Sequence, residues 1–429
     1  MRIRFLLLGW LFSVLSLPVP GRAQQPAPFD ESGIPPPRYI LHFGPEDYRA
    51  YHQNWAIVQD EQGLVYVGNT HGVLEYDGVQ WRLIRTRTTV RSLALGQNNV
   101  VYVGMQGDFG YLAPDSLGRL RFVSLLPEVD PAAREFSDVW GTHATPDGIY
   151  FQTNDYLFRW DGRQMRLWKS NTLFHTSFFV RGRFFVREKD VGIEEVVGDA
   201  LRLIPDGERF RDTRVHAMLP YDAERLLVAS RNEGLFLYDG QTFTPFPTEA
   251  DPFMAEHAVY HAAVLPGGRF ALATLGRGVL IIDRAGRLVS VLDTPHELPD
   301  DVVNFVYVDA EGGLWAALNN SGIARVAFPG ILTQYDRRLG LIGAVYDVTR
   351  HRGRLYAATG GMPGVYALEA RPLTARLEGE RATFVPVKGV PRAWSLLSVD
   401  STLFVGTDEG LYRVDHTGRG EIIVCEREN

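Results

Sequence analysis

The sequence has very little cysteine and no excess of positive charge. Its single cysteine, Cys425, lies near the C-terminal end, so no disulfide can form within the chain. An exported chain without disulfides must be stabilised by packing alone, and a bacterial periplasm is compatible with this. The formal net charge of −7 argues against a generic nucleic-acid-binding protein, because such proteins need a basic face.

Long apolar runs are also missing beyond the N-terminus. The 13-residue apolar run Phe5–Leu17 follows two arginines and precedes Gly21-Arg22-Ala23, which resembles a small-x-small cleavage site. The pattern predicts a signal peptide at residues 1–23. The run is too short for a membrane-spanning helix, which needs roughly 20 apolar residues. An uncleaved anchor is the alternative. Residues 24–38 are rich in proline, and we expect them to form a flexible leader.

The motifs of common catalytic and metal sites are absent from the sequence. There is no G-x-S-x-G, no H-E-x-x-H and no EF-hand loop. The glycine-rich stretch Gly360–Gly364 leads into a strand, which is not the context of a phosphate-binding loop. If His257 and His261 share one face of a strand, they lie about 13 Å apart, too far to share a metal. The sequence therefore predicts no catalytic residue, cofactor or metal.

The chain repeats with a period of about 42 residues, and this repeat is its strongest feature. Each unit has a short apolar strand, a turn, a second strand ending near a glycine, an aromatic-rich third strand and a tight turn into a fourth. Residues 54–84 show every part, and eight further units follow them. The glycine that opens the third strand recurs at Gly72, Gly110, Gly192, Gly234, Gly278, Gly322, Gly364 and Gly410, and Tyr156 takes its place in one unit.

Four antiparallel strands per repeat predict an all-β fold, a β-propeller of four-stranded blades. The segments are short, β-branched and bounded by turn residues, and no window shows sustained helical periodicity, so helices should be few. A solenoid is the structural alternative. Because propellers close with about 4–8 blades, we expect a seven-bladed propeller at residues 39–328, a connection at 329–343, and two blades of a second, incomplete propeller at 344–429. Two blades cannot close a ring, so we expect the chain to be truncated or to need a partner.

The repeats resemble a known family. The stretch Asp309-Ala310-Glu311-Gly312-Gly313-Leu314-Trp315 and the recurring G-x-x-x-Y-D-G resemble the two-component regulator propeller repeats, and residues 52–78 are similar to the first blade of such sensors. The resemblance covers about 40–427. It implies the periplasmic sensor part of a bacterial one-piece or hybrid two-component regulator. Such proteins often continue into a β-sandwich, a membrane helix and a kinase, cyclase or DNA-binding output, none of which this chain contains.

In a propeller, the loops between second and third strands and the crossovers between blades surround one mouth of the central channel. Ligand sites in concave rings favour this mouth. Here these segments are rich in amides, arginine and aromatic rings, which suit a sugar or a peptide; ordinary solvated loops are the alternative. The candidate ligand-binding residues are Gln53, Asn54, Trp55, Asn69, His71, Gln106, Asp108, Trp140, Asn154, Asp155, Arg187, His216, Arg231, Asn232, Tyr260, Arg277, Asn304, Asn319 and Asn320.

Three functions remain open at this point. The first is a periplasmic, non-enzymatic propeller that senses a small molecule, oligosaccharide or peptide at the mouth and passes the signal to an output domain absent from this chain, or to a partner subunit. The second is a secreted lyase or glycosidase acting on polysaccharide, with Asp108, Asp155, Asp190 and Glu233 as candidate carboxylates. The third is a protein-interaction scaffold. No nucleic acid is expected as a partner, and membrane attachment is expected only through a missing segment.

The Asp-Gly pairs at residues 77–78, 161–162 and 239–240 look like a site signature. Asp-Gly between two apolar strands favours a primed two-residue hairpin turn, because glycine supplies the positive φ that this turn needs. We expect these pairs to join third and fourth strands on the face away from the mouth. They are predicted to have a structural role, as connections between strands.

Overall fold

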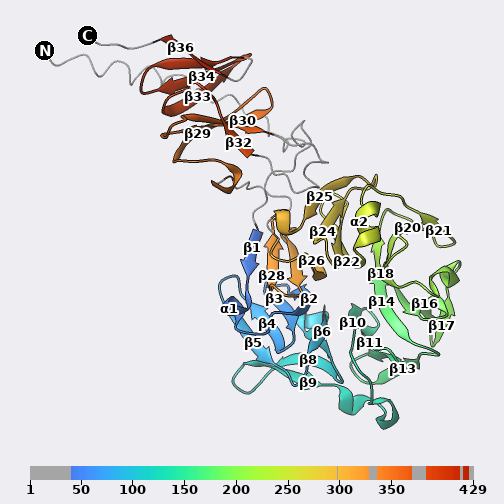
Figure 1. Ribbon diagram of the computed structural model, residues 1–429. Coiled ribbons are helices and arrows are strands. Elements are labelled where there is room, and N and C mark those ends of the chain that lie inside the picture. The colour runs from blue at the N-terminus through green and yellow to red at the C-terminus, as the bar shows by residue number, and fades with distance from the viewer. Residues whose placement is uncertain are drawn as a thin grey trace, which may run out of the picture. The chain divides into compact units, whose positions relative to one another are not determined.

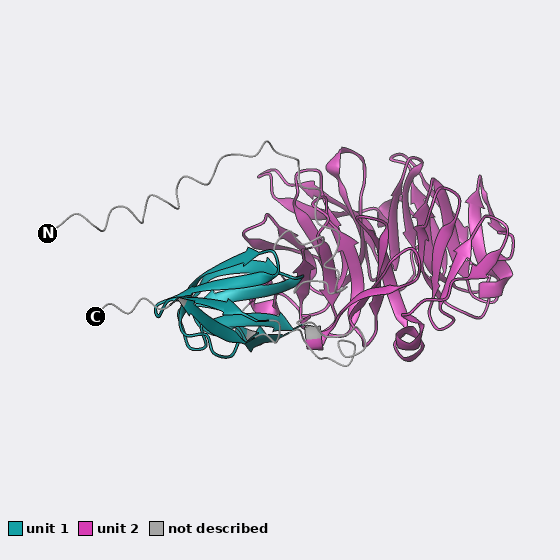
Figure 2. Ribbon diagram, turned by 90° about the horizontal axis from the view of Figure 1, so that it is seen from above, with its two compact units in different colours: residues 1–35, 336–376, 380–429 teal, residues 36–335, 377–379 magenta. Residues whose placement is uncertain are grey.

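The computed structural model of the chain describes residues 40–296, 298–327, 335, 337–369, 383–415 and 419–424. The predicted signal peptide and leader, part of the predicted connection at 329–343, and Cys425 lie outside these residues. The chain divides into two compact units (Figure 2). The first unit along the described chain is the one of residues 36–335 and 377–379, magenta and labelled unit 2 in the figure, and the second is the one of residues 1–35, 336–376 and 380–429, teal and labelled unit 1. The described residues form nine four-stranded sheets, all of them antiparallel, which confirms the all-β prediction.

Seven of these sheets belong to the first unit and are named blades 1 to 7 in chain order. Blade 1 contains β2 (Asn54–Gln59), β3 (Val65–Asn69), β4 (Gly72–Tyr76) and β5 (Trp81–Arg85). Blade 2 contains β6 (Val90–Leu95), β7 (Val101–Met105), β8 (Phe109–Pro114) and β9 (Leu120–Ser124). Blade 3 contains β10 (Gly141–Thr145), β11 (Gly148–Gln152), β12 (Tyr156–Trp160) and β13 (Met165–Lys169). Blade 4 contains β14 (Phe174–Val180), β15 (Arg183–Glu188), β16 (Gly192–Val197) and β17 (Ala200–Leu203).

The remaining blades follow the same order. Blade 5 contains β18 (Val215–Pro220), β19 (Leu226–Ser230), β20 (Leu235–Tyr238) and β21 (Phe243–Pro245). Blade 6 contains β22 (Val259–Leu265), β23 (Arg269–Thr274), β24 (Val279–Ile282) and β25 (Leu288–Leu292). Blade 7 contains β26 (Val303–Val308), β27 (Leu314–Leu318), β28 (Ile323–Val326) and, as its outermost strand, β1 (Ile40–Phe43).

The seven blades form a closed ring (Figure 1). The first strand of each blade contacts the first strand of the next, and β26 of blade 7 contacts β2 of blade 1. The apolar core follows the same plan, because seven clusters of buried side chains each join two adjacent blades. This is the predicted β-propeller, and the solenoid alternative is wrong, because stacked coils would not bring β26 back to β2.

The ring is closed by a strand that the repeat pattern did not reveal. β1 pairs antiparallel with β28 over Ile40–Phe43, so the N-terminal strand completes the last blade. The ring of Phe43 lies 5.1 Å from that of Tyr76 and 5.3 Å from that of Trp81, both in blade 1. The strand therefore ties blade 7 to blade 1 by backbone pairing and by aromatic packing.

Glycine is required at the start of the third strand for a steric reason. At Gly278, with φ of +59°, an added Cβ would lie 1.9 Å from the carbonyl oxygen of Leu292 at the end of the fourth strand. At Gly322, with φ of +89°, it would lie 2.2 Å from the carbonyl oxygen of Phe43 in the closing strand. A side chain is therefore excluded by both space and backbone conformation, which explains why this glycine marks the repeat.

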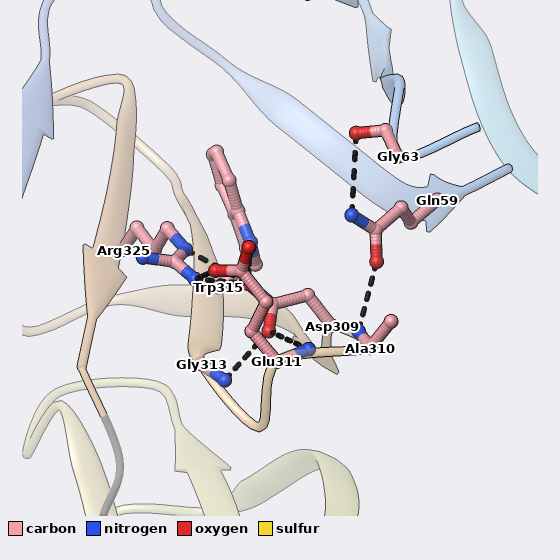
Figure 3. Close-up of polar contacts among 8 residues, drawn as sticks. All are labelled: Gln59, Gly63, Asp309, Ala310, Glu311, Gly313, Trp315 and Arg325. Atoms are coloured by element: carbon pink, nitrogen blue, oxygen red, sulfur yellow. Dashed lines mark hydrogen bonds and ion pairs between the residues drawn. The ribbon is translucent and has the colours of Figure 1, made fainter. Parts of the chain in front are cut away.

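The Asp-x-x-Gly turn between first and second strands is held by its aspartate (Figure 3). In blade 7, Asp309 Oδ1 accepts hydrogen bonds from the backbone N–H groups of Glu311 and Gly313, while Oδ2 accepts from Trp315 Nε1 at 2.9 Å and Arg325 Nε at 2.8 Å. Gln59 of blade 1 accepts from the backbone N–H of Ala310 at 2.8 Å. The turn thus also joins blade 7 to blade 1, and Trp315 lies in the core between them, with 2% of its surface exposed.

The Asp-Gly pairs do join third and fourth strands, but the expected two-residue turn is wrong. Tyr76 pairs with Trp81, which leaves a four-residue loop at 77–80. Gly78 alone takes positive φ there, and the Asp77 carboxylate accepts the backbone N–H groups of Val79 and Gln80. Loops 161–164 and 239–242 repeat this arrangement. Aspartate therefore serves as a side-chain acceptor and does not adopt the left-handed conformation.

Helices are short among the described residues. They are α1 (Pro45–Tyr48) and α2 (Asp251–Glu256), with 3-10 turns η1 (Gln97–Asn99), η2 (Leu126–Glu128), η3 (Pro131–Ala133), η4 (Gly207–Phe210), η5 (Thr294–His296) and η6 (Arg337–Leu339). The premise that His257 and His261 share a strand is wrong, because His257 caps the C-terminus of α2 while His261 lies in β22. None of these helices is long and apolar enough to cross a membrane.

The second unit contains the other two sheets, again of four strands each. They are β29 (Val345–His351), β30 (Arg354–Thr359), β31 (Val365–Glu369) and β32 (Thr383–Pro386), then β33 (Ala393–Val399), β34 (Thr402–Thr407), β35 (Leu411–Val414) and β36 (Gly420–Val424). One apolar cluster joins the two sheets. Their first strands nevertheless expose large apolar side chains, including Tyr346 (56%), Val348 (58%) and Trp394 (44%).

Candidate functional site

The first strand of six of the seven blades begins with the same irregularity. Pairing with the second strand skips one residue, a β-bulge, at Trp55, Arg91, His175, His216, Tyr260 and Asn304. In blade 3, Trp140 stands directly before β10 in the corresponding place, with its backbone N–H bound to the Gln152 carbonyl. A bulge re-aims the side chain of the extra residue. We call these seven side chains the mouth belt.

Contacts across the ring bring Trp55, Arg91 and Trp140 of the mouth belt together over the channel. The rings of Trp55 in blade 1 and Trp140 in blade 3 lie 6.3 Å apart, edge to face, although blade 2 separates their strands. The Arg91 guanidinium of blade 2 lies 4.1 Å from the Trp55 ring centroid and 5.0 Å from that of Trp140. Arg91 Nε also donates to Asp138 Oδ1 at 2.7 Å. These groups form an aromatic half of the belt with a fixed, paired cation.

The other half of the belt lies beside two arginines that are not themselves belt residues. The ring of His216 lies 5.4 Å from that of His175 and 5.1 Å from that of Tyr260. Arg214 directly precedes β18 and Arg231 directly follows β19. Their backbones are joined by a hydrogen bond from the Arg231 N–H to the Arg214 carbonyl. Neither guanidinium pairs with an acidic side chain among the described residues, so the positive charge on this side of the mouth is uncompensated.

Burial keeps both histidines of the belt neutral. It lowers the pKa of His216 to about 3, and the positive charges of Arg231 and Arg214 act in the same direction. The pKa of His175 is also lowered to about 3 by burial, with Arg214 as the next cause. Burial likewise raises the pKa of Tyr260. At neutral pH each imidazole therefore offers one donor and one acceptor nitrogen.

Three polar atoms of the mouth belt are buried without a hydrogen-bond partner among the residues that the structure describes. They are Trp55 Nε1, His175 Nδ1 and His216 Nε2. His216 is only 7% exposed. A buried polar group without a partner costs about 1–3 kcal/mol, so native proteins rarely retain one without a reason. Other buried atoms, such as Trp81 Nε1 and Gln152 Oε1, also lack a partner among the described residues, but the belt brings three of them together at one mouth.

The predicted amides mostly serve the seam between blades 7 and 1. Asn54 and Asn69 are fully buried, and the Asn69 amide donates to Asn54 Oδ1 and to two backbone carbonyls. Asn319 Oδ1 accepts from Gln53 at 2.6 Å and from Asn304 at 3.3 Å. Asn304 belongs to the mouth belt and the other four residues lie beside it, but the amide groups of all five are engaged within the protein.

The other predicted residues are spread over the loops. Arg187 is buried and donates to the carbonyls of Phe210 and Arg211. Arg277 pairs with Asp293. Asn154 accepts from Trp140 Nε1 at 3.0 Å and so orients a belt residue. Asp108 lies apart, in a hollow of blade 2. The side chains of His71, Gln106, Asp155, Asn232 and Asn320 are exposed at loop ends, and Arg231 is half-buried.

The four candidate carboxylates of the enzyme alternative lie on four different blades. Asp108, Asp155, Asp190 and Glu233 belong to loops of blades 2, 3, 4 and 5, and none is hydrogen-bonded to another in the described chain. Glu233 instead accepts from the Thr213 hydroxyl. Among the residues described, no group of three or more acidic, histidine or cysteine side chains is placed to hold a metal ion.

One belt residue, His175, was missed as a candidate. It occupies the same register as Trp55 and Arg91, directly after the first residue of the first strand. Reading that position across all repeats gives Trp55, Arg91, Trp140, His175, His216, Tyr260 and Asn304, followed by Tyr346 and Trp394 in the second unit. The signal was therefore present in the repeat alignment, because the bulge recurs at one fixed position.

No family model matches the sequence, and no curated protein matches it. Solved structures do resemble it in fold. The extracellular domain of a hybrid two-component system from B. thetaiotaomicron is 14% identical, with a TM-score of 0.60, over 91% of this chain and 55% of that one. The extracellular domain of a one-component system from the same organism is 15% identical, with a TM-score of 0.53, over 90% and 53%.

The chain thus spans about half the length of these two structures. Virginiamycin B lyase from Staphylococcus aureus is also similar, at 11% identity and a TM-score of 0.51, over 68% of this chain and 99% of the lyase. At such identities the similarity shows the fold, a β-propeller. The first two structures are extracellular domains of bacterial one- and hybrid two-component systems, the class of protein that the sequence repeats resemble.

Proposed function

We propose that this chain is a ligand-sensing β-propeller of a bacterial signal-transduction receptor, without enzymatic activity of its own. The ligand is a small polar molecule, oligosaccharide or peptide that binds at the mouth belt. The proposal includes export by residues 1–23, a leader at 24–38, a periplasmic location, and transmission to an output domain outside residues 1–429. It also includes membership of the two-component regulator propeller family.

One observation carries the proposal. The first strands of the ring place seven polar or aromatic side chains around one mouth, and three of them leave a buried polar atom without a partner. Core packing alone would favour apolar side chains at these positions, because each unpaired polar atom destabilises the folded protein. A ligand that supplies the missing hydrogen bonds recovers that free energy on binding.

The two halves of the belt fit different parts of such a ligand. Trp55 and Trp140 offer ring faces for the apolar face of a sugar or side chain, since aromatic rings combine large contact area with few rotatable bonds. His175, His216 and Tyr260 offer hydrogen-bonding groups, and the nearby Arg214 and Arg231 favour hydroxyl-rich or negatively charged groups. Binding would bias the ring toward one of its conformations and so carry the signal.

The test compares two tryptophans whose indole N–H groups are both unpaired. Trp55 lies in the mouth belt, whereas Trp81 lies on β5 against Tyr76, at a ring distance of 4.5 Å. The purified protein is screened against oligosaccharides and short peptides by thermal shift, and each hit is measured by calorimetry with Trp55→Phe and Trp81→Phe. Losing one hydrogen bond weakens binding by about three- to tenfold.

We expect Trp55→Phe to weaken binding by this factor and Trp81→Phe to leave it unchanged. The proposal fails if no compound class stabilises the folded protein. It also fails if every hit binds both variants as tightly as the original protein.

A further inference from the structure

Blade 2 carries a hollow that the mouth belt does not include. It has a volume of about 700 Å³ and lies where the end of β5, the crossover after it, the loop before β8 and strand β9 meet. Ligand cavities typically have volumes of about 300–1,000 Å³. The polar side chains that line the hollow include Arg85, Arg87, Arg121, Arg134 and Asp108. No mouth-belt residue lines it.

The charge of this hollow is strongly positive in a protein whose net charge is −7. Four arginines and one carboxylate, Asp108, line it. Arg134 is held in place by hydrogen bonds from Nε to the Val129 carbonyl and from Nη2 to the Pro127 carbonyl, each 2.9 Å long. Arg85, Arg87 and Arg121 form no ion pair with an acidic side chain in the described part of the chain.

By contrast, other exposed arginines nearby do have acidic partners. Arg119, on the turn that leads into β9, pairs with Asp115 at 3.3 Å. Arg82, on β5, pairs with Glu75 at 2.8 Å. The arginines of the hollow therefore differ from their neighbours on the same strands. Four arginines share a single carboxylate, Asp108, in the hollow, so like charges there repel one another, and an anion placed between them relieves this repulsion.

The carboxylate and the floor of the hollow add selectivity. Asp108 Oδ1 accepts from the Ser124 hydroxyl and from the Phe109 backbone N–H, both at 2.7 Å, which fixes its orientation. Burial raises the pKa of Asp108, while the hydrogen bond from Ser124 opposes this. Met105, Phe122 and Leu126 supply an apolar surface. An inorganic ion would use the arginines alone, whereas a ring-sized organic anion would also cover this surface.

We propose that the hollow of blade 2 is a second binding site, separate from the mouth, for a small organic anion. Its anionic oxygens, of a carboxylate or a phosphate monoester, bind Arg87 and Arg121, which can each form paired hydrogen bonds with such groups. Its apolar face lies on Phe122 and Leu126, and a hydroxyl group donates to Asp108. This proposal does not depend on the function proposed for the mouth.

The experiment uses three probes that share one sugar ring: D-glucuronate, D-glucose 6-phosphate and D-glucose. Binding to the purified protein is measured by ligand-observed NMR titration. Arg121→Gln and Arg87→Gln test the site. Arg119→Gln is the matched control, two residues from Arg121 on the same hairpin but paired with Asp115. All three arginines are exposed, so the variants should fold, and circular dichroism verifies this.

We expect at least one anionic probe to bind and D-glucose not to bind. Arg121→Gln and Arg87→Gln each weaken the binding by about tenfold, because each removes a charge-assisted hydrogen bond. Arg119→Gln and Trp55→Phe leave it unchanged, and about 0.5 M salt weakens it through screening. Which anionic probe binds more tightly identifies the anionic group as carboxylate or phosphate.

Three results would overturn the proposal. In the first, neither anionic probe shows saturable binding. In the second, Arg121→Gln and Arg119→Gln bind equally well. In the third, Trp55→Phe abolishes the binding, which would place the anion at the mouth and leave the mouth proposal standing.

Discussion

Asp309→Asn and Glu311→Gln remove the same negative charge from the same partner. Both carboxylates lie 2.7 Å from Arg325 Nη2, yet the Asp309 side chain is 2% exposed and the Glu311 side chain is 79% exposed. The pair of variants therefore compares a buried interaction with a surface one in a single turn (Figure 3).

The expected magnitudes follow from what each carboxylate holds. Asparagine at position 309 can still accept the backbone N–H groups of Glu311 and Gly313, but it places an NH₂ group against Trp315 Nε1 and Arg325. The buried Trp315 Nε1 and the Arg325 guanidinium, which is 22% exposed, then lose this acceptor. Breaking a fully buried charge pair typically costs about 3–5 kcal/mol, so the lower end of this range applies. We expect Asp309→Asn to lower the free energy of unfolding of the ring by about 3 kcal/mol. Glu311→Gln should lower it by less than about 1 kcal/mol.

Urea denaturation followed by tryptophan fluorescence measures both values. Six of the eight tryptophans lie within residues 36–335, so this signal reports mainly on the ring. If the two variants lose equal stability, burial adds nothing to the contribution of the Asp309 carboxylate, and the reasoning is refuted.

Three further predictions concern the ring. Gly278→Ala should lower the urea midpoint more than Gly78→Ala, because an added Cβ meets Leu292 O at 1.9 Å in the first case and nothing within 4 Å in the second. Phe43→Ala should lower the free energy of unfolding by about 2–3 kcal/mol, because this half-buried ring anchors the closing strand. Urea denaturation of the purified variant measures this loss, and a loss below half of the expected value would mean that β1 is not needed for closure. His261 has a folded pKa lowered by burial from 6.5 to about 4. Between these values only the unfolded chain takes up the proton, so stability falls as the pH decreases from 7 to 5. In His261→Gln the free energy of unfolding should fall less steeply with decreasing pH, by the equivalent of up to one proton per molecule. An equal slope would contradict the assignment of His261 as neutral in the folded protein.

The sequence predicted the architecture well because its signals are local. The third-strand glycine is required where the fourth strand passes, as at Gly278, and so it counts the blades. The closing strand Ile40–Phe43 was not recognised, because its partner β28 is far away in the sequence and the strand carries no turn or glycine of its own. Closure of a ring is a property of the whole chain that no single repeat displays.

The candidate site was predicted only in part. Trp55, Trp140, His216 and Tyr260 were chosen from the crossovers and lie in the mouth belt. Asn54 and Asn69 were chosen for the same reason, yet their amides are buried and bind backbone carbonyls. An asparagine that stabilises a loop and an asparagine that binds a ligand look identical in the sequence. Only the positions of the surrounding carbonyl groups in the folded protein distinguish them.

The indole N–H resonances of the isotope-labelled protein test the central claim most directly. A compound that stabilises the protein is titrated while the signals of Trp55, Trp140, Trp81 and Trp168 are followed, each assigned by a Trp→Phe variant. Binding at the mouth belt predicts that the Trp55 signal shifts most, because its N–H gains a partner, that Trp140 follows, and that Trp81 and Trp168 stay in place. A saturable ligand that leaves Trp55 unshifted would contradict the account.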